Sequence, residues 1–220
     1  MTDHDPSTNI NIVDTIENDT VFNVGTKMHY KSLIHQKSEK PKSEDRLQKR
    51  LNIYNIDFGQ VYTSKIKHIK DLKLAEFNYK VLHNKLPCNK NLKKWDKQID
   101  DACDVCNDVQ DICHLLYECK FNAKIWNLLG SVLNCNITMA QIIIGDQAHS
   151  QNLLTSLLSF YIYKYWLICK NDKKPRVWKD VRVFIISELN YRREVYKLTK
   201  LKENCGAIER LKQAFIQCVI

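Results

Sequence analysis

Four potential metal ligands lie close together in the middle of the chain, with the spacing Cys-x2-Cys-x7-His-x4-Cys. They are Cys103, Cys106, His114 and Cys119. Two cysteines separated by two residues can direct both thiolates at one centre, and a second nearby pair completes the tetrahedron that Zn²⁺ prefers. All four positions are filled by protein, which leaves no open position for a catalytic water. The spacing therefore predicts one Zn²⁺ with a structural role.

Two alternatives concern the same cysteines. Free buried cysteines are common in protein cores, but the segment 100–111 is acidic and polar, without the apolar periodicity that would bury them. Cys113 directly precedes His114 and could compete with it as a ligand. The gap of four residues between His114 and Cys119 matches the usual spacing of a second ligand pair better, so His114 is the predicted ligand. The acids Asp101, Asp104 and Asp108 are interpreted as a solvated polar loop.

Composition is that of an ordinary globular protein, with 220 residues and a hydrophobic fraction of 44%. Outside the cluster, the spacing of the nine cysteines does not suggest disulfide pairs, and no signal peptide opens the sequence. An intracellular protein is expected, without a distinction between nucleus and cytoplasm. The longest apolar stretch, 153–169, is interrupted by Lys164 and does not predict a membrane span, so no membrane partner is expected.

Charge is distributed unevenly around a net value of +9. Residues 1–29 form an acidic arm rich in Asn and Thr, which is expected to be disordered. Residues 65–97 carry ten lysines against three acids, and 164–212 are basic as well. A basic stretch of this kind is compatible with binding to phosphates, although lysines also keep ordinary helices solvated.

The pattern of apolar residues predicts an all-α protein, because they recur at helical spacing and only five glycines and four prolines interrupt them. We expect a helical bundle with a small zinc-knuckle-like insert between helices. The predicted organisation is a basic helical lead-in at 30–98, the zinc-binding motif and its following helix at 99–134, and a C-terminal helical region at 135–220. Predicted helices cover 43–51, 66–86, 89–95, 115–129, 153–169, 177–201 and 207–218, with a loop at 55–59.

Two sequence runs resemble a known family. Residues 73–95 read KLAEFNYKVLHNKLPCNKNLKKW, and 103–126 read CDVCNDVQDICHLLYECKFNAKIW, with Trp126 seven positions after the last cysteine. They resemble the zinc-binding C-terminal domain of LINE-type, non-LTR retrotransposon reverse transcriptases and the stretch that precedes it. The similarity covers about residues 30–134, and 159–200 are a looser match to the helical end of such proteins. The resemblance implies a parent protein that nicks DNA and copies element RNA onto the break.

The motifs that would perform those reactions are not found in this sequence. The sequence contains no polymerase motif of the form (Tyr/Phe)-x-Asp-Asp. The pair Asp100-Asp101 lies in a linker without flanking hydrophobic strands. The stretch 174–180 lacks the acidic pair and lysine of a restriction-like nuclease. We therefore expect no catalysis, and interpret the chain as the C-terminal piece of such a protein or as a genomic remnant expressed alone.

The sequence predicts that basic helices bind RNA or DNA, with lysines on phosphates and exposed aromatics on unpaired bases. Phe77 and Trp126 share apolar helix faces and are assigned to the core. The predicted contact residues are Lys70, Lys73, Tyr79, Lys80, Lys85, Lys90, Lys93, Lys94 and Trp95.

Two other functions stay open. The chain could be a protein-interaction module that docks on a polymerase domain or on a second copy of itself, through an apolar period between Val177 and Leu201. It could also be a retroelement remnant without function. The salt dependence of binding distinguishes phosphate contacts from an apolar interface, because only phosphate contacts weaken steeply as ionic strength rises.

Overall fold

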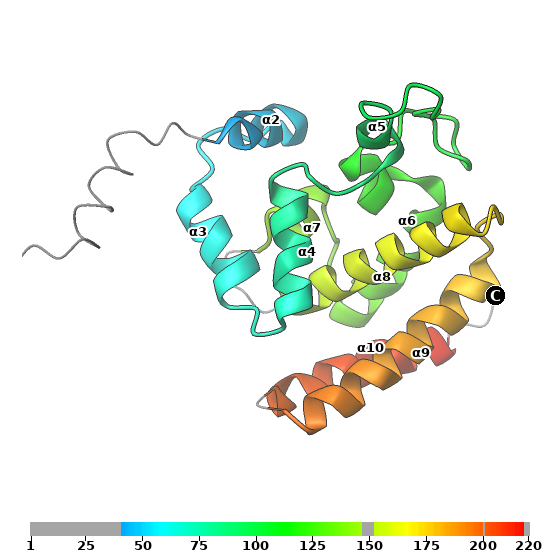
Figure 1. Cartoon of the computed structure of the whole chain (residues 1–220). Coiled ribbons are helices and arrows are strands. Elements are labelled where there is room, and N and C mark those ends of the chain that lie inside the picture. The colour runs from blue at the N-terminus through cyan, green and yellow to red at the C-terminus, as the bar shows by residue number, and fades with distance from the viewer. Residues whose placement is uncertain (1–40, 147–151, 200, 218–220) are drawn as a thin grey trace, which may run out of the picture. The chain divides into compact units, whose positions relative to one another are not determined.

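The computed structural model describes residues 41–146, 152–199 and 201–217 (Figure 1). In these ranges the chain is helical, and its only β-type pairing is an isolated bridge between Ala102 and Val109. The predicted all-α class is therefore confirmed. The acidic arm at 1–29 lies outside the described residues.

The helices follow one another through short connections. They are α2 (Lys42–Leu51), α3 (Phe58–Tyr62), α4 (Leu72–Leu82), α5 (Asn89–Leu92), α6 (Lys120–Leu133), α7 (Met139–Ile143), α8 (Asn152–Asn171), α9 (Trp178–Lys197) and α10 (Cys205–Gln217). Two π-helical turns, Thr63–Lys67 and His114–Glu118, and a 3-10 turn, Lys202–Asn204, complete the described secondary structure.

The predicted helix at 66–86 is wrong in two places, because the chain leaves the helical conformation between Lys67 and Leu72, and α4 ends at Leu82. The carboxylate of Asp71 accepts a hydrogen bond from the backbone N–H of Leu74 at 3.2 Å and starts α4 there. The predicted loop at 55–59 is wrong at its end for a similar reason. Asp57 accepts from Gln60 N at 3.1 Å, so α3 begins at Phe58.

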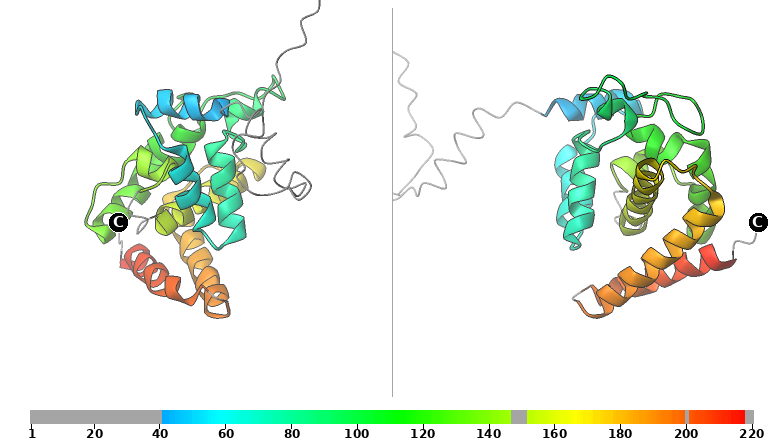
Figure 2. Two further views of the ribbon diagram at one scale, coloured as in Figure 1. Left: turned by 90° about the vertical axis from the view of Figure 1, so that its left-hand side faces the viewer. Right: turned by 45° about the vertical axis from the view of Figure 1, so that its right-hand side comes forward.

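Helix α8 forms the centre of the described fold. It lies between α4 and α7 on one side and the antiparallel pair of α9 and α10 on the other (Figures 1 and 2). Its side chains Leu157, Leu158 and Tyr161 are completely buried. Phe77 of α4 packs on this helix through Phe160, with ring centroids 5.4 Å apart, which confirms its assignment to the core.

The apolar side chains of α9, which were predicted as a docking surface, are largely buried inside the fold. Val181, Ile185 and Leu189 are completely buried, and they belong to the same hydrophobic core as the α8 side chains. Leu198 at the end of the period is 88% exposed. A buried ion pair between Arg192 of α9 and Asp71, the residue before α4, also holds α9 to the start of α4.

Lys65 does not belong to the basic surface on which its sequence position places it. Its side chain is only 1% exposed, and Nζ donates to the carbonyl oxygen of Ile142 at 2.9 Å and to Ser156 Oγ at 3.1 Å. Burial lowers the pKa of the Lys65 ammonium to about 7.

None of the helices in the described part of the chain is long and apolar enough to cross a membrane.

Candidate metal centre

The four predicted ligands come together in the structure. One side-chain ligand atom from each of Cys103, Cys106, His114 and Cys119 lies within 4.8 Å of all the others. Cys119 Sγ is 3.8 Å from Cys103 Sγ and 3.7 Å from Cys106 Sγ. Two thiolates on one tetrahedral Zn²⁺ at the usual Zn–S distance stand about 3.8 Å apart, whereas a disulfide requires about 2.05 Å. The spacing is that of a metal site.

The first two ligands sit on a tight hairpin. Cys103 N donates to the carbonyl oxygen of Asp108 at 2.8 Å, and Asn107 N donates back to the carbonyl oxygen of Cys103 at 2.9 Å. Asn107 adopts a φ of 61°, a left-handed conformation that asparagine tolerates better than most residues. The bridge between Ala102 and Val109 closes the hairpin. This turn places both thiols on the side that faces Cys119.

The second pair lies at the ends of one π-helical turn, His114–Glu118. Asp111 Oδ1 accepts from the backbone N–H of His114 at 2.9 Å and so fixes the start of the turn. Cys119 then leaves the helical conformation, with φ −59° and ψ 126°, and serves as the N-cap residue of α6. Trp126 stabilises the turn, because its indole Nε1 donates to the carbonyl oxygen of Leu116 at 2.8 Å.

The environment of Cys103 favours its thiolate, whereas the hydrogen bond that Cys119 donates to Cys103, together with burial, raises the pKa of Cys119. The thiol of Cys119 and the backbone N–H groups of Val105 and Cys106 lower the pKa of Cys103 far below that of a free thiol, because each hydrogen bonds to the charged form. The backbone N–H of Lys120 donates to Cys106 Sγ at 3.3 Å. A deprotonated cysteine such as Cys103 is the form that coordinates a metal.

His114 completes the donor set. Its side chain is 4% exposed, and its Nε2 atom is buried without a hydrogen-bond partner among the described residues. A buried polar atom without a partner costs free energy, and a bound metal would satisfy it. Three thiolates and one imidazole are the ligands that suit Zn²⁺. The residues present therefore fit this ion.

Cys113, the alternative ligand, is buried away from the four. It lines a separate cleft together with Leu47 and Val81. Burial raises the pKa of its thiol to about 12. The structure thus brings His114, and not Cys113, to the other three cysteines.

Arg176 is a contact of this cluster that the sequence did not reveal. It follows α8, and its Nη2 atom lies 3.1 Å from Cys103 Sγ and 2.7 Å from Asp104 Oδ1. Arg176 Nε also donates to Asp104 Oδ2 at 3.1 Å, and the guanidinium lies over the ring of Phe121. Asp104 is therefore more than the solvated loop residue that we expected. No local spacing relates Arg176 to the motif, which is why sequence inspection missed it.

Arg176→Ala is expected to weaken zinc binding by about tenfold to a hundredfold, the usual effect of losing a group that contacts a metal ligand. The guanidinium donates to the Cys103 sulfur and holds the hairpin through Asp104. Competition with a chromogenic chelator measures the change. Lys174→Ala is the matched control, since Lys174 pairs with Asp172 in an exposed position. Equal zinc affinity in the two variants would contradict the role of Arg176.

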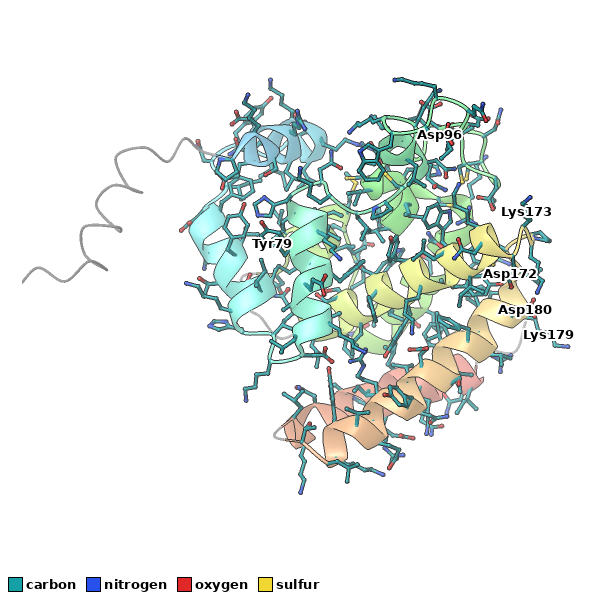
Figure 3. The ribbon with its side chains drawn as sticks, viewed as in Figure 1. Tyr79, Asp96, Asp172, Lys173, Lys179 and Asp180 are labelled. Carbon is teal, nitrogen blue, oxygen red and sulfur yellow. The ribbon has the colours of Figure 1, made fainter. Side chains whose placement is uncertain are left out.

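The predicted nucleic-acid residues are mostly exposed. Tyr79 is 50% and Trp95 73% exposed, and Figure 3 shows Tyr79 on α4. Some of the lysines have acidic partners. Lys93 Nζ lies 2.7 Å from Asp101 Oδ1, and Lys80 Nζ lies 2.7 Å from Glu76 Oε1. The lysines that lie on the surface are Lys70, Lys73, Lys80, Lys85, Lys90 and Lys94, with Lys93 half-buried.

Comparison with known proteins finds a family model that matches the segment around this cluster. Residues 26–126 match the family model described as zinc-binding in reverse transcriptase, and the match includes all four ligand positions. Neither the curated proteins nor the solved structures give a match. Residues 26–126 are therefore similar to the zinc-binding region of reverse transcriptases.

Proposed function

We propose that this chain is a non-catalytic, zinc-stabilised module of a LINE-type retrotransposon reverse transcriptase, and that it binds RNA or DNA through basic helices. The observation that carries the proposal is the set of four ligand atoms within 4.8 Å, inside a segment that matches the zinc-binding family. That family is an accessory module and not a catalytic one.

Zn²⁺ would be held by Cys103, Cys106, His114 and Cys119. A bound ion supplies the free energy that fixes the hairpin to the start of α6, because its ligands come from both. The four protein ligands fill a tetrahedral shell, so the ion has a structural role and does not activate water.

The basic surface supports the nucleic-acid part of the proposal. Lys73 is exposed in the first turn of α4, Tyr79 is exposed in its last turn, and Lys85 is exposed three residues after it. Trp95, in the turn after α5, is a second exposed aromatic. Lysines contribute salt-sensitive affinity for phosphates, and exposed aromatics can stack on unpaired bases.

Lys73→Gln/Lys85→Gln is expected to weaken binding to single-stranded RNA and DNA and to reduce its salt dependence. Each lost phosphate contact lowers the slope of log affinity against log salt by about 0.7 for a single strand. Fluorescence anisotropy with the full chain across a salt series measures both quantities. The control Lys179→Gln/Lys202→Gln removes the same charge from α9 and the turn before α10. Affinity and slope that fall equally in both variants would show that only net charge matters.

Docking on a polymerase domain or on a second copy is the alternative. Its support comes from two exposed side chains, Val183 of α9 at 61% and Leu198 directly after α9 at 88%, whereas the centre of the predicted stripe is buried. A chain that binds no nucleic acid at low salt, but associates with a polymerase domain independently of salt, would favour this alternative.

A further inference from the structure

A cleft of about 360 Å³ lies beside the metal cluster, between α2, the end of α4 and the segment that leads into His114. Figure 1 shows α2 and α5 at the end of the described fold where α4 finishes. Pockets of this size accommodate small organic ligands. The cleft has two chemically different parts, a basic rim and an apolar floor.

The rim carries four cations and one acid. Arg46 and Arg50 come from α2, Lys90 from α5, Lys94 from the turn after it, and the acid is Asp111. The carboxylate of Asp111 already accepts a hydrogen bond from Arg50 Nε at 3.1 Å and lies 3.9 Å from Lys90 Nζ. Glu118, outside the cleft, also binds Arg50.

Two of these cations are available to a ligand. Arg46 makes no ion pair with the described residues, and Lys94 Nζ donates only to the neutral Asn91 Oδ1 at 2.8 Å. Both side chains are exposed at the mouth of the cleft. The rim therefore keeps an excess of positive charge, which is complementary to a phosphate group.

The floor is apolar. It is formed by Leu47 of α2, Val81 of α4, Ile112 and Ile143, all of them core residues, together with Cys113. A flat nucleobase can lie against such a surface, whereas an acidic side chain cannot gain from it.

The metal motif forms one wall of the cleft. Asp111, Ile112 and Cys113 directly precede His114, and Asp111 Oδ1 accepts the backbone N–H of His114 at 2.9 Å. Arg50 reaches across from α2 to the same carboxylate. Ordering of the motif thus also orders a wall and part of the rim.

We propose that this cleft binds one unstacked nucleotide of a single-stranded nucleic acid, with its phosphate at Arg46 and Lys94 and its base over Leu47 and Val81. This assignment rests on the nucleic-acid function proposed above and adds a defined site to it. An acidic peptide would match the rim alone, so the combination of rim and floor favours the nucleotide.

Arg46→Gln/Lys94→Gln in the full chain tests the site. The probe is a fluorescent oligothymidylate of about ten nucleotides, within the length that single-strand binding sites cover. Its comparison is an abasic deoxyribose-phosphate oligomer of the same length and charge. We expect the wild type to bind oligothymidylate about tenfold more tightly than the abasic oligomer, since base contacts add to the phosphate contacts. We expect the variant to lose about tenfold in affinity, as two charged contacts are removed.

Lys179→Gln/Lys202→Gln serves as the control of equal charge and should retain most of the affinity. Zinc content and far-ultraviolet circular dichroism establish that the variants are folded. A second measurement uses the wild type alone: thymidine monophosphate should shift the methyl NMR signals of Ile112 and Ile143, which line the floor.

The outcomes separate the site from the general function. Wild-type affinity for oligothymidylate in Arg46→Gln/Lys94→Gln would overturn the site and leave nucleic-acid binding intact. The site would also be overturned if the wild type bound the abasic oligomer as tightly as oligothymidylate. Displacement of oligothymidylate by polyglutamate as effective as that by unlabelled oligothymidylate would have the same meaning, because the cleft would then recognise charge alone. A wild-type chain that binds no oligonucleotide at low salt would reject the proposed function, and the site with it.

Discussion

Cys119→Ser is expected to abolish zinc binding and to unfold the segment from the hairpin to the start of α6. Cys119 is completely buried, and its sulfur lies 3.8 Å from Cys103 Sγ and 3.7 Å from Cys106 Sγ. It also serves as the N-cap residue of α6. The binding free energy of a structural zinc is folding free energy, about 10–16 kcal/mol in isolated zinc-binding peptides. The loss should therefore be far larger than that of an ordinary core substitution.

Zinc content and circular dichroism, with and without a strong chelator, measure this effect. Cys205→Ser is the matched control, because Cys205 lies on α10 and does not belong to the cluster. By the same reasoning Cys88, Cys135 and Cys169 are expected to be dispensable for zinc binding. The same expectation for Cys218, which lies outside the described residues, rests on its distance from the motif in the sequence. A Cys119→Ser chain with wild-type helicity, or a wild-type chain indifferent to the chelator, would exclude a structural metal.

Lys65→Met is expected to remove a large pH dependence of stability. The ordinary pKa of 10.5 applies to Lys65 in the unfolded chain, whereas burial lowers its pKa to about 7 in the folded chain. Between these values only the unfolded chain binds the proton. The free energy of unfolding therefore rises with pH from about 7 to 10.5, at about 1.4 kcal/mol per pH unit from this residue.

Urea unfolding over this pH range gives the slope for each variant. The slope is the informative quantity, because methionine also leaves the carbonyl oxygen of Ile142 without its donor. Lys67→Met is the control, since Lys67 is an exposed neighbour on the same π-helical turn. If Lys65→Met and Lys67→Met retain the same slope, Lys65 is charged in the folded chain and the account of its burial fails.

The metal motif was predictable because its information is local. All four ligands fall between Cys103 and Cys119, so ligand spacing alone restricts the geometry. The core positions of Phe77 and Trp126 followed from helical periodicity for the same reason. Helix α7 was missed although its signal is local, since Thr138 and Gln141 form a capping box that the sequence displays.

Other features depend on contacts between distant segments. Lys65 was counted with the surface lysines, but its burial depends on Ile142 and Ser156, which lie far along the chain. Arg176 reaches Cys103 across a similar separation. The rim of the cleft combines Arg46 with Lys94 in the same way. Composition and periodicity carry no information on such pairings, because packing of the helices decides them.

X-ray absorption spectroscopy at the zinc edge of the full chain tests the central claim most directly. The account predicts one zinc per chain with three sulfur ligands at about 2.3 Å and one nitrogen ligand at about 2.0 Å, and the same spectrum for Cys113→Ser. A wild-type site with four sulfur ligands that becomes three in Cys113→Ser would contradict the assignment of His114. A chain purified without chelators that contains no zinc would contradict the account as a whole.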